Sequence, residues 1–260
     1  MRQAVRVPGQ APTGGAVPTP ARLANMALLD GQVALVTGGS RGIGLATARG
    51  LGRLGATVVV VGRDPHAAVA VLVDEGLDAV GQACDVADVQ AVLALPGALG
   101  PLREVDVLVT AAGVMSERMS KTLRTSPQEW RRVLSVNLDG TWAALAAFGP
   151  AMAQRRRGRI VTLSACLGRM SGPGTSGGLA PYRVSKAAVN ALTKNLAAEM
   201  GDGRRGVFVD AVCPGHCRTD MGGPEAPRSA EQGADTVLWL ATREPGPTGL
   251  LWEDRQPVPW

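Results

Sequence analysis

Short apolar runs that are rich in β-branched residues recur along the 260-residue chain, and longer stretches with helical character separate most of them. The runs lie at Val33–Thr37, Thr57–Val61, Val105–Thr110, Arg159–Ser164 and Val207–Val212. Strands that alternate with helices form a parallel sheet, because each right-handed crossover returns the chain to the same end of the sheet. The pattern therefore predicts an α/β fold: a doubly wound parallel sheet between two layers of helices, a three-layer αβα arrangement in a single domain.

The two ends of the chain depart from this alternation. Residues 1–25 are rich in Pro, Gly, Ala and Thr and show no apolar period, so we expect a disordered extension, which a mis-assigned start codon would explain as well as a function would. Residues 26–260 then form the folded domain. A helix is expected from about 230 to 241, and Gly246–Trp252 indicates one more strand. The Gly-, Ser- and Pro-rich segment Ser171–Gly178 predicts a flexible loop.

Composition and charge narrow the class of protein. With 45% hydrophobic but only 3% aromatic residues, the core must be built mostly from Val, Leu and Ala, which suits parallel strands covered on both faces. The formal net charge of +5 fits an anionic ligand, and the basic cluster at 155–159 is typical of a solvated helix end, so we expect no nucleic-acid partner. No segment approaches the ~20 apolar residues of a membrane span, and the N-terminus lacks the apolar core of a signal peptide. We therefore expect a cytoplasmic protein with no membrane partner.

Four cysteines, Cys84, Cys166, Cys213 and Cys217, are expected to be reduced, buried thiols in that compartment. The segment Cys-Pro-Gly-His-Cys that begins at Cys213 superficially resembles a metal site. Its Pro-Gly pair forces a turn, however, and no second ligand pair follows at a zinc-site spacing. We therefore predict no metal site.

A glycine-rich segment, Val36-Thr37-Gly38-Gly39-Ser40-Arg41-Gly42-Ile43-Gly44, joins the first predicted strand to an amphipathic helix. Glycines there permit a tight turn and a close backbone approach to a pyrophosphate, while free N–H groups at the helix N-terminus bind phosphate oxygens. The strand before and the helix after supply the context that a glycine triplet alone lacks. The segment predicts dinucleotide binding through Gly38, Ser40, Arg41, Gly42, Ile43 and Gly44.

The end of the second predicted strand indicates which dinucleotide is bound. A carboxylate there accepts hydrogen bonds from the adenosine ribose of NAD, whereas an arginine accommodates the 2′-phosphate of NADP. Gly62 occupies the usual acidic position and Arg63 follows it, with Arg41 as a second cation and Asp64 as a nearby carboxylate. Two guanidiniums without a well-placed carboxylate favour NADP(H) as the cofactor.

Tyr182 is the only tyrosine of the chain, and Lys186 follows it at the i+4 position. Positions i and i+4 share a helix face, so phenol and ammonium can be neighbours, and an ammonium lowers the pKa of a nearby phenol. A packed tyrosine beside a solvated lysine would give the same spacing. The nearby cofactor motif favours an acid–base role, since a phenol with its ordinary pKa of about 10 needs such a shift to work at neutral pH.

Together these motifs resemble those of the short-chain dehydrogenase/reductase family, and the C-terminal half is similar to its carbonyl-reductase-like branch. The resemblance covers roughly residues 29–260 and rests on Thr37-Gly38-x-x-x-Gly42-x-Gly44, Asp85-Val86, Val136-Asn137, Tyr182-x-x-x-Lys186 and Pro214-Gly215 with Thr219. It implies a Rossmann-type fold in which residues 26–260 form a dinucleotide-binding reductase domain. It also implies NADP(H)-dependent reduction of a small-molecule carbonyl substrate, a ketone or an aldehyde. A homo-oligomer is compatible with the family.

The resemblance further implies roles for single residues. Tyr182 is the expected proton donor, Lys186 lowers its pKa and holds the nicotinamide ribose, and Asn137 supports a water-linked proton relay to the lysine. Asp85 matches an adenine contact and Thr219 a carboxamide contact, although a helix cap or a turn residue would explain either position as well. The remaining expected cofactor contacts are Val86, Gly113, Pro214 and Gly215.

One position departs from the family pattern where it matters for chemistry. Counted back from Gly168, the place of the family's catalytic serine falls on Ala165 and not on Ser164. Adjacent strand residues point to opposite faces, so Ser164 can replace the lost hydroxyl only through a local bulge. Losing one donor to a developing oxyanion costs about 10²–10³ in rate. Several explanations would account for an alanine at the serine position. The enzyme could be a slower reductase, its substrate could supply its own hydroxyl, the chain could be engineered, or a hydroxyl of the following loop could replace the serine. Those loop hydroxyls are Ser171, Thr175 and Ser176.

Smaller departures leave several functions open. The segment 110–113 keeps the family's glycine but lacks its usual asparagines, and Asp210 stands where asparagine is more frequent. Asp220–Ser229 leaves little room for a helical lid, which predicts an open pocket suited to bulky or multi-ring ketones. The leading hypothesis is a carbonyl reductase. The alternatives are a nucleotide-binding sensor or scaffold without turnover, which Ala165 would favour, and a reductase of an imine or activated alkene.

Overall fold

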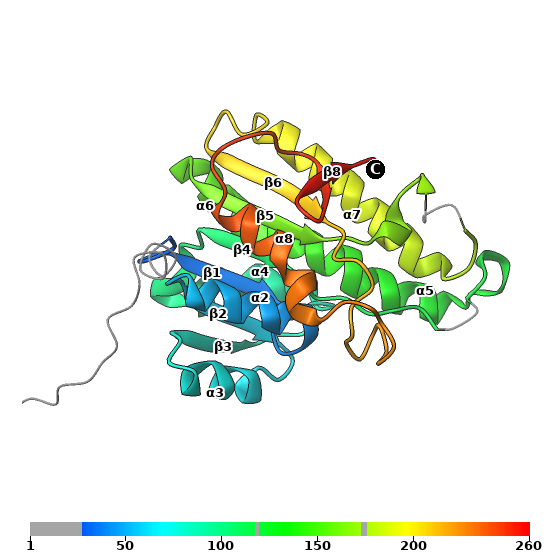
Figure 1. The fold of residues 1–260 in the computed structure, drawn as a ribbon, viewed down its shortest axis with the longest axis horizontal. Coiled ribbons are helices and arrows are strands. Elements are labelled where there is room, and N and C mark those ends of the chain that lie inside the picture. Colours follow the sequence, from blue (N-terminus) through cyan, green and yellow to red (C-terminus); the bar gives the residue numbers. More distant parts are fainter. Residues whose placement is uncertain (1–27, 118–119, 173–175) are drawn as a thin grey trace, which may run out of the picture.

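A computed structural model describes residues 28–117, 120–172 and 176–260 (Figure 1). The expected extension over residues 1–25 lies outside the described residues, and so do residues 173–175 of the expected flexible loop. No helix in the described ranges is long and apolar enough to cross a membrane.

The centre of the molecule is an eight-stranded sheet with the strand order β3-β2-β1-β4-β5-β6-β7-β8. Its strands are β1 (Val33–Thr37), β2 (Thr57–Gly62), β3 (Ala79–Ala83), β4 (Val107–Thr110), β5 (Gly158–Leu163), β6 (Val207–Val212), β7 (Leu251–Glu253) and β8 (Gln256–Val258). Neighbouring strands from β3 to β7 pair in parallel. The chain steps outward from β1 in both directions, which is the doubly wound sheet that the alternating pattern predicts.

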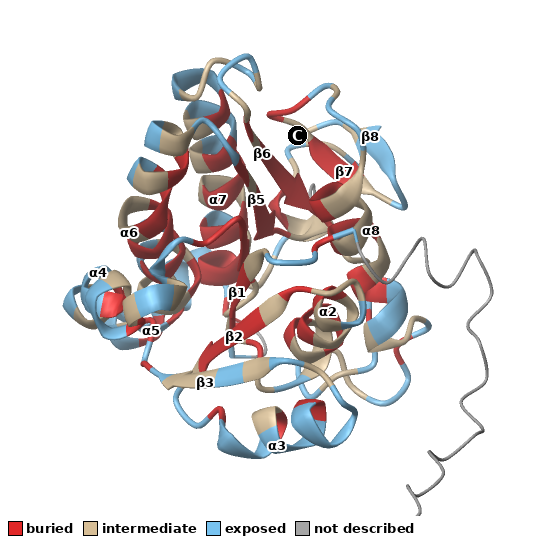
Figure 2. Cartoon of the chain, turned by 90° about the vertical axis from the view of Figure 1, so that its left-hand side faces the viewer, coloured by how far each residue is buried: buried red, intermediate tan, exposed pale blue. Residues whose placement is uncertain are grey.

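Helices cover both faces of this sheet, as Figure 2 shows. The α-helices are α2 (Gly42–Arg53), α3 (His66–Asp74), α4 (Val89–Ala98), α5 (Pro127–Leu134), α6 (Gly140–Arg155), α7 (Ala180–Glu199) and α8 (Ala230–Thr242). One buried apolar cluster joins α4, α6 and α7 to one face, and a second joins α2, α3 and α8 to the other. The three-layer αβα arrangement in one domain follows, with a core dominated by Val, Leu and Ala.

The strand pattern differs from the sequence prediction at two places. β3, with the sequence AVGQA, lies at the edge of the sheet and is not among the β-branched runs, because an edge strand needs less apolar surface. At the other edge β8 pairs with β7 in antiparallel fashion, and the sequence pattern predicts no strand at the position of β8. The turn between them places Asp254 and Arg255 at positive φ, 49° and 61°, as a two-residue hairpin requires.

Short helical turns complete the fold. The 3-10 turns are η1 (Gly100–Arg103), η2 (Thr122–Arg124) and η4 (Cys166–Gly168), and η3 (Ser135–Asp139) is a π-helical turn between α5 and α6. Because β1, β4, β5 and β6 run in parallel, the segments that follow them meet at one edge of the sheet. That edge is where the sequence motifs converge.

Candidate active site

Tyr182 and Lys186 lie in the first two turns of α7. Leu179, with φ at 52°, turns the chain into the helix, and Pro181 occupies the first turn, where its missing N–H costs nothing. Both functional side chains are buried, with 6% of Tyr182 and 5% of Lys186 exposed. The Lys186 Nζ atom lies 5.9 Å from the centre of the Tyr182 ring. The i, i+4 spacing therefore makes the phenol and the amine neighbours in a site largely shielded from water.

The amine of Lys186 is anchored to the sheet. Its Nζ donates a hydrogen bond of 2.6 Å to the carbonyl oxygen of Leu163, the last residue of β5. Burial lowers the pKa of Lys186 to about 8 from its ordinary value of 10.5, because desolvation disfavours the charged form. The amine can therefore release a proton close to neutral pH.

The pKa of Tyr182 moves opposite to the sequence expectation. Burial raises it well above its ordinary value, and the neighbouring Cys166 and Cys213 raise it further. The expectation that Lys186 lowers this pKa is wrong for the protein alone, because the lysine is bound to the Leu163 carbonyl and desolvation of the phenol dominates. Tyr182 therefore holds its proton throughout the neutral range.

Asn137 is held rigidly in the π-helical turn η3. Its amide oxygen accepts a hydrogen bond from Val114 N (2.8 Å), and its Nδ2 donates to the Val114 carbonyl (3.0 Å) and to Ser185 Oγ (3.0 Å). A π-turn inside a longer helical segment is frequently found at functional sites. A Cβ atom at Gly113 would lie 3.5 Å from Asn137 Oδ1 and 3.8 Å from Lys186 Nζ. Asn137, Gly113 and Lys186 thus meet at one point.

Two serines that carry no motif of their own fix the position of Tyr182. The backbone N–H of Tyr182 donates to Ser116 Oγ at 2.9 Å, which satisfies a free donor in the first turn of α7. The hydroxyl of Ser185 donates to the Tyr182 carbonyl at 2.7 Å. Nothing in the sequence points to Ser116, 66 residues away from its partner. Ser185 lies inside the Tyr-x-x-x-Lys motif, and its only sequence signal is that position.

Ser164 does not face the same side as the position after it. Its hydroxyl donates to Asn190 Oδ1 at 2.5 Å and to the Lys186 carbonyl at 3.3 Å, so it points into the packing between β5 and α7. Ala165 continues in extended backbone, with φ −159° and ψ 153°, in which neighbouring side chains point to opposite faces. The side chain at the expected serine position is therefore a methyl group.

The loop hydroxyls after Ala165 have different surroundings. Ser171 Oγ is buried and has no hydrogen-bond partner within the described ranges, whereas Ser176 Oγ accepts a hydrogen bond from Arg183 at 2.8 Å. Thr175 lies outside the described residues. Among the described residues, the Ser171 hydroxyl is therefore left to accept a hydrogen bond from a ligand or to donate one to it.

The glycine loop is built so that no side chain fits at three of its positions. A Cβ atom at Gly38 would lie 2.6 Å from Ala112, and one at Gly44 would lie 2.1 Å from the carbonyl of Gly38. Gly42 begins α2 at a φ of 53°. Helix α2 has no side-chain cap and no acidic residue in its first turn, so its N-terminal dipole is left for an anion.

A buried hydroxyl without a hydrogen-bond partner also indicates that an anion binds at the glycine loop. Ser40 Oγ is buried without a hydrogen-bond partner among the described residues, which is costly unless a ligand completes it. A Cβ atom at Gly62 would lie 2.5 Å from this oxygen, so the end of β2 and the glycine loop touch there. The close-packed glycines, the uncapped helix and the unpaired hydroxyl fit the phosphates of a dinucleotide.

The segment after β6 closes onto the glycine loop. A Cβ atom at Gly42 would lie 3.0 Å from the methyl group of Thr219, and Arg41 forms an ion pair of 2.7 Å with Asp220. Pro214 and Gly215 precede this contact, with Gly215 at a φ of 74°. Residues separated by almost the whole domain are thereby brought to one edge, as the family motif requires.

The expected adenine-side residues lie at the ends of β2 and β3. Arg63 and Asp64 are exposed, and the Asp64 carboxylate accepts a hydrogen bond from the His66 N–H at 3.2 Å. Asp85 is exposed and accepts from the Ala87 N–H at 3.0 Å, the turn role that the sequence left open. Val86 is buried, and its carbonyl would lie 2.6 Å from a Cβ atom at Gly140.

The Cys-Pro-Gly-His-Cys segment has a structural explanation. The Cys217 thiol donates to the Pro214 carbonyl at 3.3 Å, and His216 Nε2 hydrogen-bonds with the Gly222 carbonyl at 2.8 Å. Within the described residues, no group of three or more His, Cys, Asp or Glu side chains could hold a metal ion.

A glycine loop at the carboxyl edge of a doubly wound sheet, beside a buried Tyr–Lys pair, defines a nicotinamide-dependent oxidoreductase site. The family model described as short chain dehydrogenase matches residues 32–230. The chain belongs to the short-chain dehydrogenase/reductase family.

The similar proteins include several that are named as reductases. The chain is 40% identical over 194 residues to the short-chain reductase protein NovJ of Streptomyces niveus, covering 73% of this chain and 71% of NovJ. A 3-oxoacyl-[acyl-carrier protein] reductase from Brucella melitensis with bound NAD superposes with a TM-score of 0.77 at 30% identity, covering 92% of this chain and 95% of that one. An actinorhodin polyketide ketoreductase with NADPH gives 0.74 at 32% identity, covering 84% and 92%.

Proposed function

We propose that the protein is an NADPH-dependent reductase of a ketone or aldehyde, with Tyr182 as the proton donor. The observation that carries the proposal is the buried Tyr182–Lys186 pair, whose amine reaches the Gly113–Asn137 contact at the edge where the glycine loop lies. The relatives named as reductases support the reaction type. The residues of the site then have the following roles.

When bound, the nicotinamide supplies a hydride to the carbonyl carbon. Tyr182 holds the proton that the carbonyl oxygen needs as negative charge develops on it, and its raised pKa keeps that proton in place at neutral pH. Lys186, with its pKa lowered to about 8, can replace the proton that Tyr182 gives up. Asn137 holds the backbone at Val114 through two hydrogen bonds and so keeps the position next to Lys186 fixed.

The preference for NADPH rests on the surroundings of Ser40. A carboxylate in the usual position would have to replace Gly62, and its Cβ atom would press against Ser40 Oγ. Arg63 follows with an exposed guanidinium, and the Asp64 carboxylate is turned back onto the His66 N–H. Ser40 and Arg63 would hold the 2′-phosphate by hydrogen bonds, and Arg41 would join them by exchanging its exposed partner Asp220.

The short segment after Thr219 favours a bulky carbonyl substrate. Residues 220–229 form turns and bends and contain no α-helix, so the segment that would carry a helical lid is too short to close the site. A multi-ring ketone would gain apolar contact at such an open mouth, whereas a small ketone would remain partly in water.

One observation favours a second function, a nucleotide-binding protein with slow or no turnover. The methyl group of Ala165 supplies no hydrogen bond to a developing oxyanion, and Ser164 is committed to Asn190. An imine or an activated alkene would depend less on that missing donor. Both alternatives predict cofactor binding, so binding alone does not separate them from carbonyl reduction.

A steady-state assay of NADPH oxidation across a panel of ketones and aldehydes separates them. We expect turnover with at least one bulky ketone, and loss of that turnover in Tyr182→Phe with the NADPH affinity retained, since the substitution removes only the acidic hydroxyl. NADPH binding without turnover of any carbonyl, imine or alkene substrate would leave the non-catalytic function. Turnover by Tyr182→Phe near the parent rate would refute the proton-donor role.

Titration of both cofactors by fluorescence tests the preference. Arg63→Ala is expected to weaken NADPH binding by on the order of 1–3 kcal/mol, the size of a charge-assisted hydrogen bond, and to leave NADH binding nearly unchanged. Arg103→Ala, an exposed arginine in η1 before β4, is the control. Equal affinities of the parent protein for NADPH and NADH would contradict the preference.

A further inference from the structure

Two cysteines lie side by side at the wall of the active site. Cys166 opens the η4 turn directly after Ala165, and Cys213 directly follows β6. Because β5 and β6 are adjacent parallel strands, with Leu163 paired to Val212, both thiols are carried to the same edge of the sheet. Cys166 packs against the small buried cluster that contains Cys213.

The two thiols differ in access to solvent. Cys166 is half-buried, whereas only 2% of Cys213 is exposed. A small oxidant can therefore reach Cys166 first. Cys84 and Cys217, the other two cysteines, are both buried.

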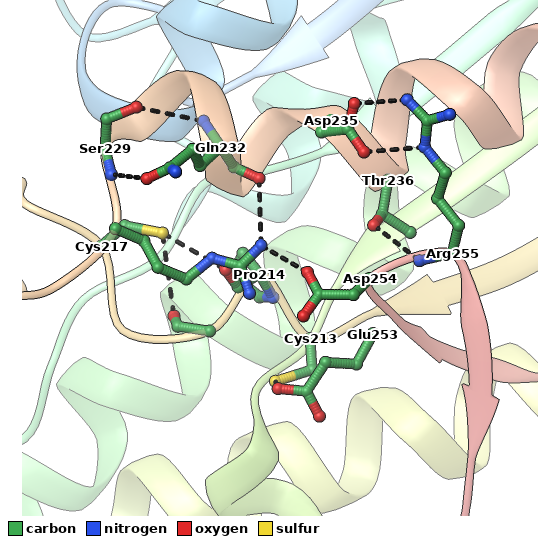
Figure 3. A network of polar contacts seen from close by, with 12 residues as sticks. Cys213, Pro214, Cys217, Ser229, Gln232, Asp235, Thr236, Glu253, Asp254 and Arg255 are labelled. Atoms are coloured by element: carbon green, nitrogen blue, oxygen red, sulfur yellow. Dashed lines mark hydrogen bonds and ion pairs between the residues drawn. The ribbon is translucent and has the colours of Figure 1, made fainter.

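The surroundings shift the pKa values of the two thiols in opposite directions. The neighbouring Cys213 thiol lowers the pKa of Cys166, and the Arg169 guanidinium acts in the same direction, against burial and the Glu253 carboxylate, which raise it. The neighbouring Cys166 thiol and burial raise the pKa of Cys213. Figure 3 shows the Cys213 thiol directed at the Glu253 carboxylate, 3.6 Å from Sγ to Oε1, and Arg169 holds the other oxygen of that carboxylate at 3.7 Å. Cys166 is thus placed as the thiolate nucleophile, and Cys213 as a thiol with a proton acceptor beside it.

We propose that Cys166 and Cys213 form a peroxide-reactive dithiol that closes to a disulfide in the wall of the active site. The Cys166 sulfur attacks one oxygen of hydrogen peroxide, the O–O bond breaks, and a sulfenic acid and hydroxide form. Cys213 then passes its proton to the Glu253 carboxylate and attacks the Cys166 sulfur, the S–O bond breaks, and the leaving hydroxide takes the proton from Glu253 to become water. In total, two thiols lose two electrons and two protons, and one peroxide becomes two waters.

The site of this modification is coupled to the catalytic residues by packing. A Cβ atom at Gly168, the last residue of η4, would lie 2.7 Å from the backbone of Lys186. A covalent bond from η4 to the end of β6 would therefore act on a turn pressed against the catalytic helix. The chemistry itself needs no cofactor and no carbonyl substrate, so its test is independent of the proposed reductase activity.

The full chain, reduced and freed of reductant, is treated with hydrogen peroxide, alkylated with iodoacetamide and digested with trypsin for mass spectrometry. We expect the peptide Ile160–Arg169 linked to Gly206–Arg218, with a loss of two hydrogen masses, and reversal by dithiothreitol. Cys84 should be alkylated only after unfolding.

Because the second peptide holds both Cys213 and Cys217, variants assign the link. It should persist in Cys217→Ala and in Cys84→Ala and vanish in Cys166→Ala. In Cys213→Ala it should also vanish, and the Cys166 sulfenic acid should accumulate and be trapped by dimedone. A link between Cys213 and Cys217, a link that survives in Cys213→Ala, or four thiols that stay reduced would each overturn the proposal. Circular dichroism of the variants verifies that they fold.

Discussion

The hydroxyl of Ser164 donates a hydrogen bond of 2.5 Å to the amide oxygen of Asn190, and this contact determines which way the end of β5 faces. Asn190 is itself buried on α7, and its Nδ2 donates to the Gly168 carbonyl at 3.3 Å. The contact holds Ser164 on the side of the helix and leaves Ala165, next in extended backbone, on the opposite side. We therefore expect this serine, although it is close to the family's catalytic position, to serve the packing of β5 against α7.

Ala165→Ser should restore a hydrogen-bond donor to the carbonyl oxygen. The rate on a simple activated ketone is expected to rise by up to about 10²–10³, the effect of one such donor, with little change in NADPH affinity. Steady-state kinetics and a cofactor titration measure the two quantities. An unchanged rate would mean that the substrate or a loop hydroxyl such as Ser171 already supplies the contact.

Ser164→Ala should affect stability and not the rate. Removal of the hydroxyl leaves the buried Asn190 Oδ1 without its donor, and we expect the free energy of unfolding to fall by about 1–3 kcal/mol. Urea denaturation measures the loss, and kcat of the same preparation should stay within a few-fold of the parent. An inactive but fully stable Ser164→Ala protein would show that Ser164 is the catalytic serine after all.

Ser116→Ala should reduce kcat without changing cofactor binding. Ser116 Oγ accepts the Tyr182 N–H at 2.9 Å, so its loss frees the first turn of α7 and the phenol it carries, at a cost of about 1 kcal/mol in stability. Ser116→Thr keeps the acceptor and should recover most of the rate. A parent-like kcat for Ser116→Ala, together with lower stability, would limit Ser116 to a structural role.

The sequence predicts those parts of the molecule that depend on local pattern. The β-branched runs locate five central strands to within two residues, and the glycine segment lies where a phosphate-binding turn is expected. β3 escapes because an edge strand of the sequence AVGQA carries one β-branched residue, Val80. The sequence does not predict the hairpin between β7 and β8, because Asp254-Arg255 lacks the Asn-Gly or Asp-Gly signature of such turns.

For the candidate site, the sequence identifies some of the residues and misses others. Tyr182 and Lys186 can be identified from their spacing. Ser116 and Asn190 act through contacts that only the tertiary fold creates. The direction of the Tyr182 pKa is missed for the same reason. Spacing reports which charges are neighbours, whereas desolvation depends on everything packed around the group.

Lys186→Met should change how stability depends on pH. Burial lowers the pKa of Lys186 to about 8 from 10.5. Between these values the unfolded chain still binds a proton that the native state has released, so this residue makes the free energy of unfolding rise with pH. Below about pH 8 the buried ammonium costs on the order of 3 kcal/mol.

The stability of Lys186→Met relative to the parent should therefore be highest below pH 8 and decline as the pH rises toward 10.5. Urea denaturation at several pH values measures the difference, in which the titration of other groups cancels. Lys194→Met, at an exposed position on the same helix, is the matched control. A pH-independent difference for Lys186→Met would refute the lowered pKa.

Asp210→Asn introduces the residue that is more frequent in the family at this position, yet here it should be strongly destabilising. The Asp210 carboxylate forms an ion pair of 3.2 Å with Arg243, and both side chains are buried, with 4% and 7% exposed. The same carboxylate accepts a hydrogen bond from Trp252 Nε1 at 2.9 Å. An amide leaves the Arg243 charge uncompensated in the core, which typically costs 3–5 kcal/mol.

The double variant Asp210→Asn with Arg243→Met separates the charge effect from the loss of the carboxylate itself. If the uncompensated guanidinium is the cause, removing it should recover much of the loss, so the double variant should be more stable than the sum of the single effects predicts. Urea denaturation of the four proteins gives this coupling energy. Additive effects, or a loss below about 1 kcal/mol for Asp210→Asn, would show that Arg243 reaches water or another acceptor. The ion pair would then not explain why position 210 holds an aspartate.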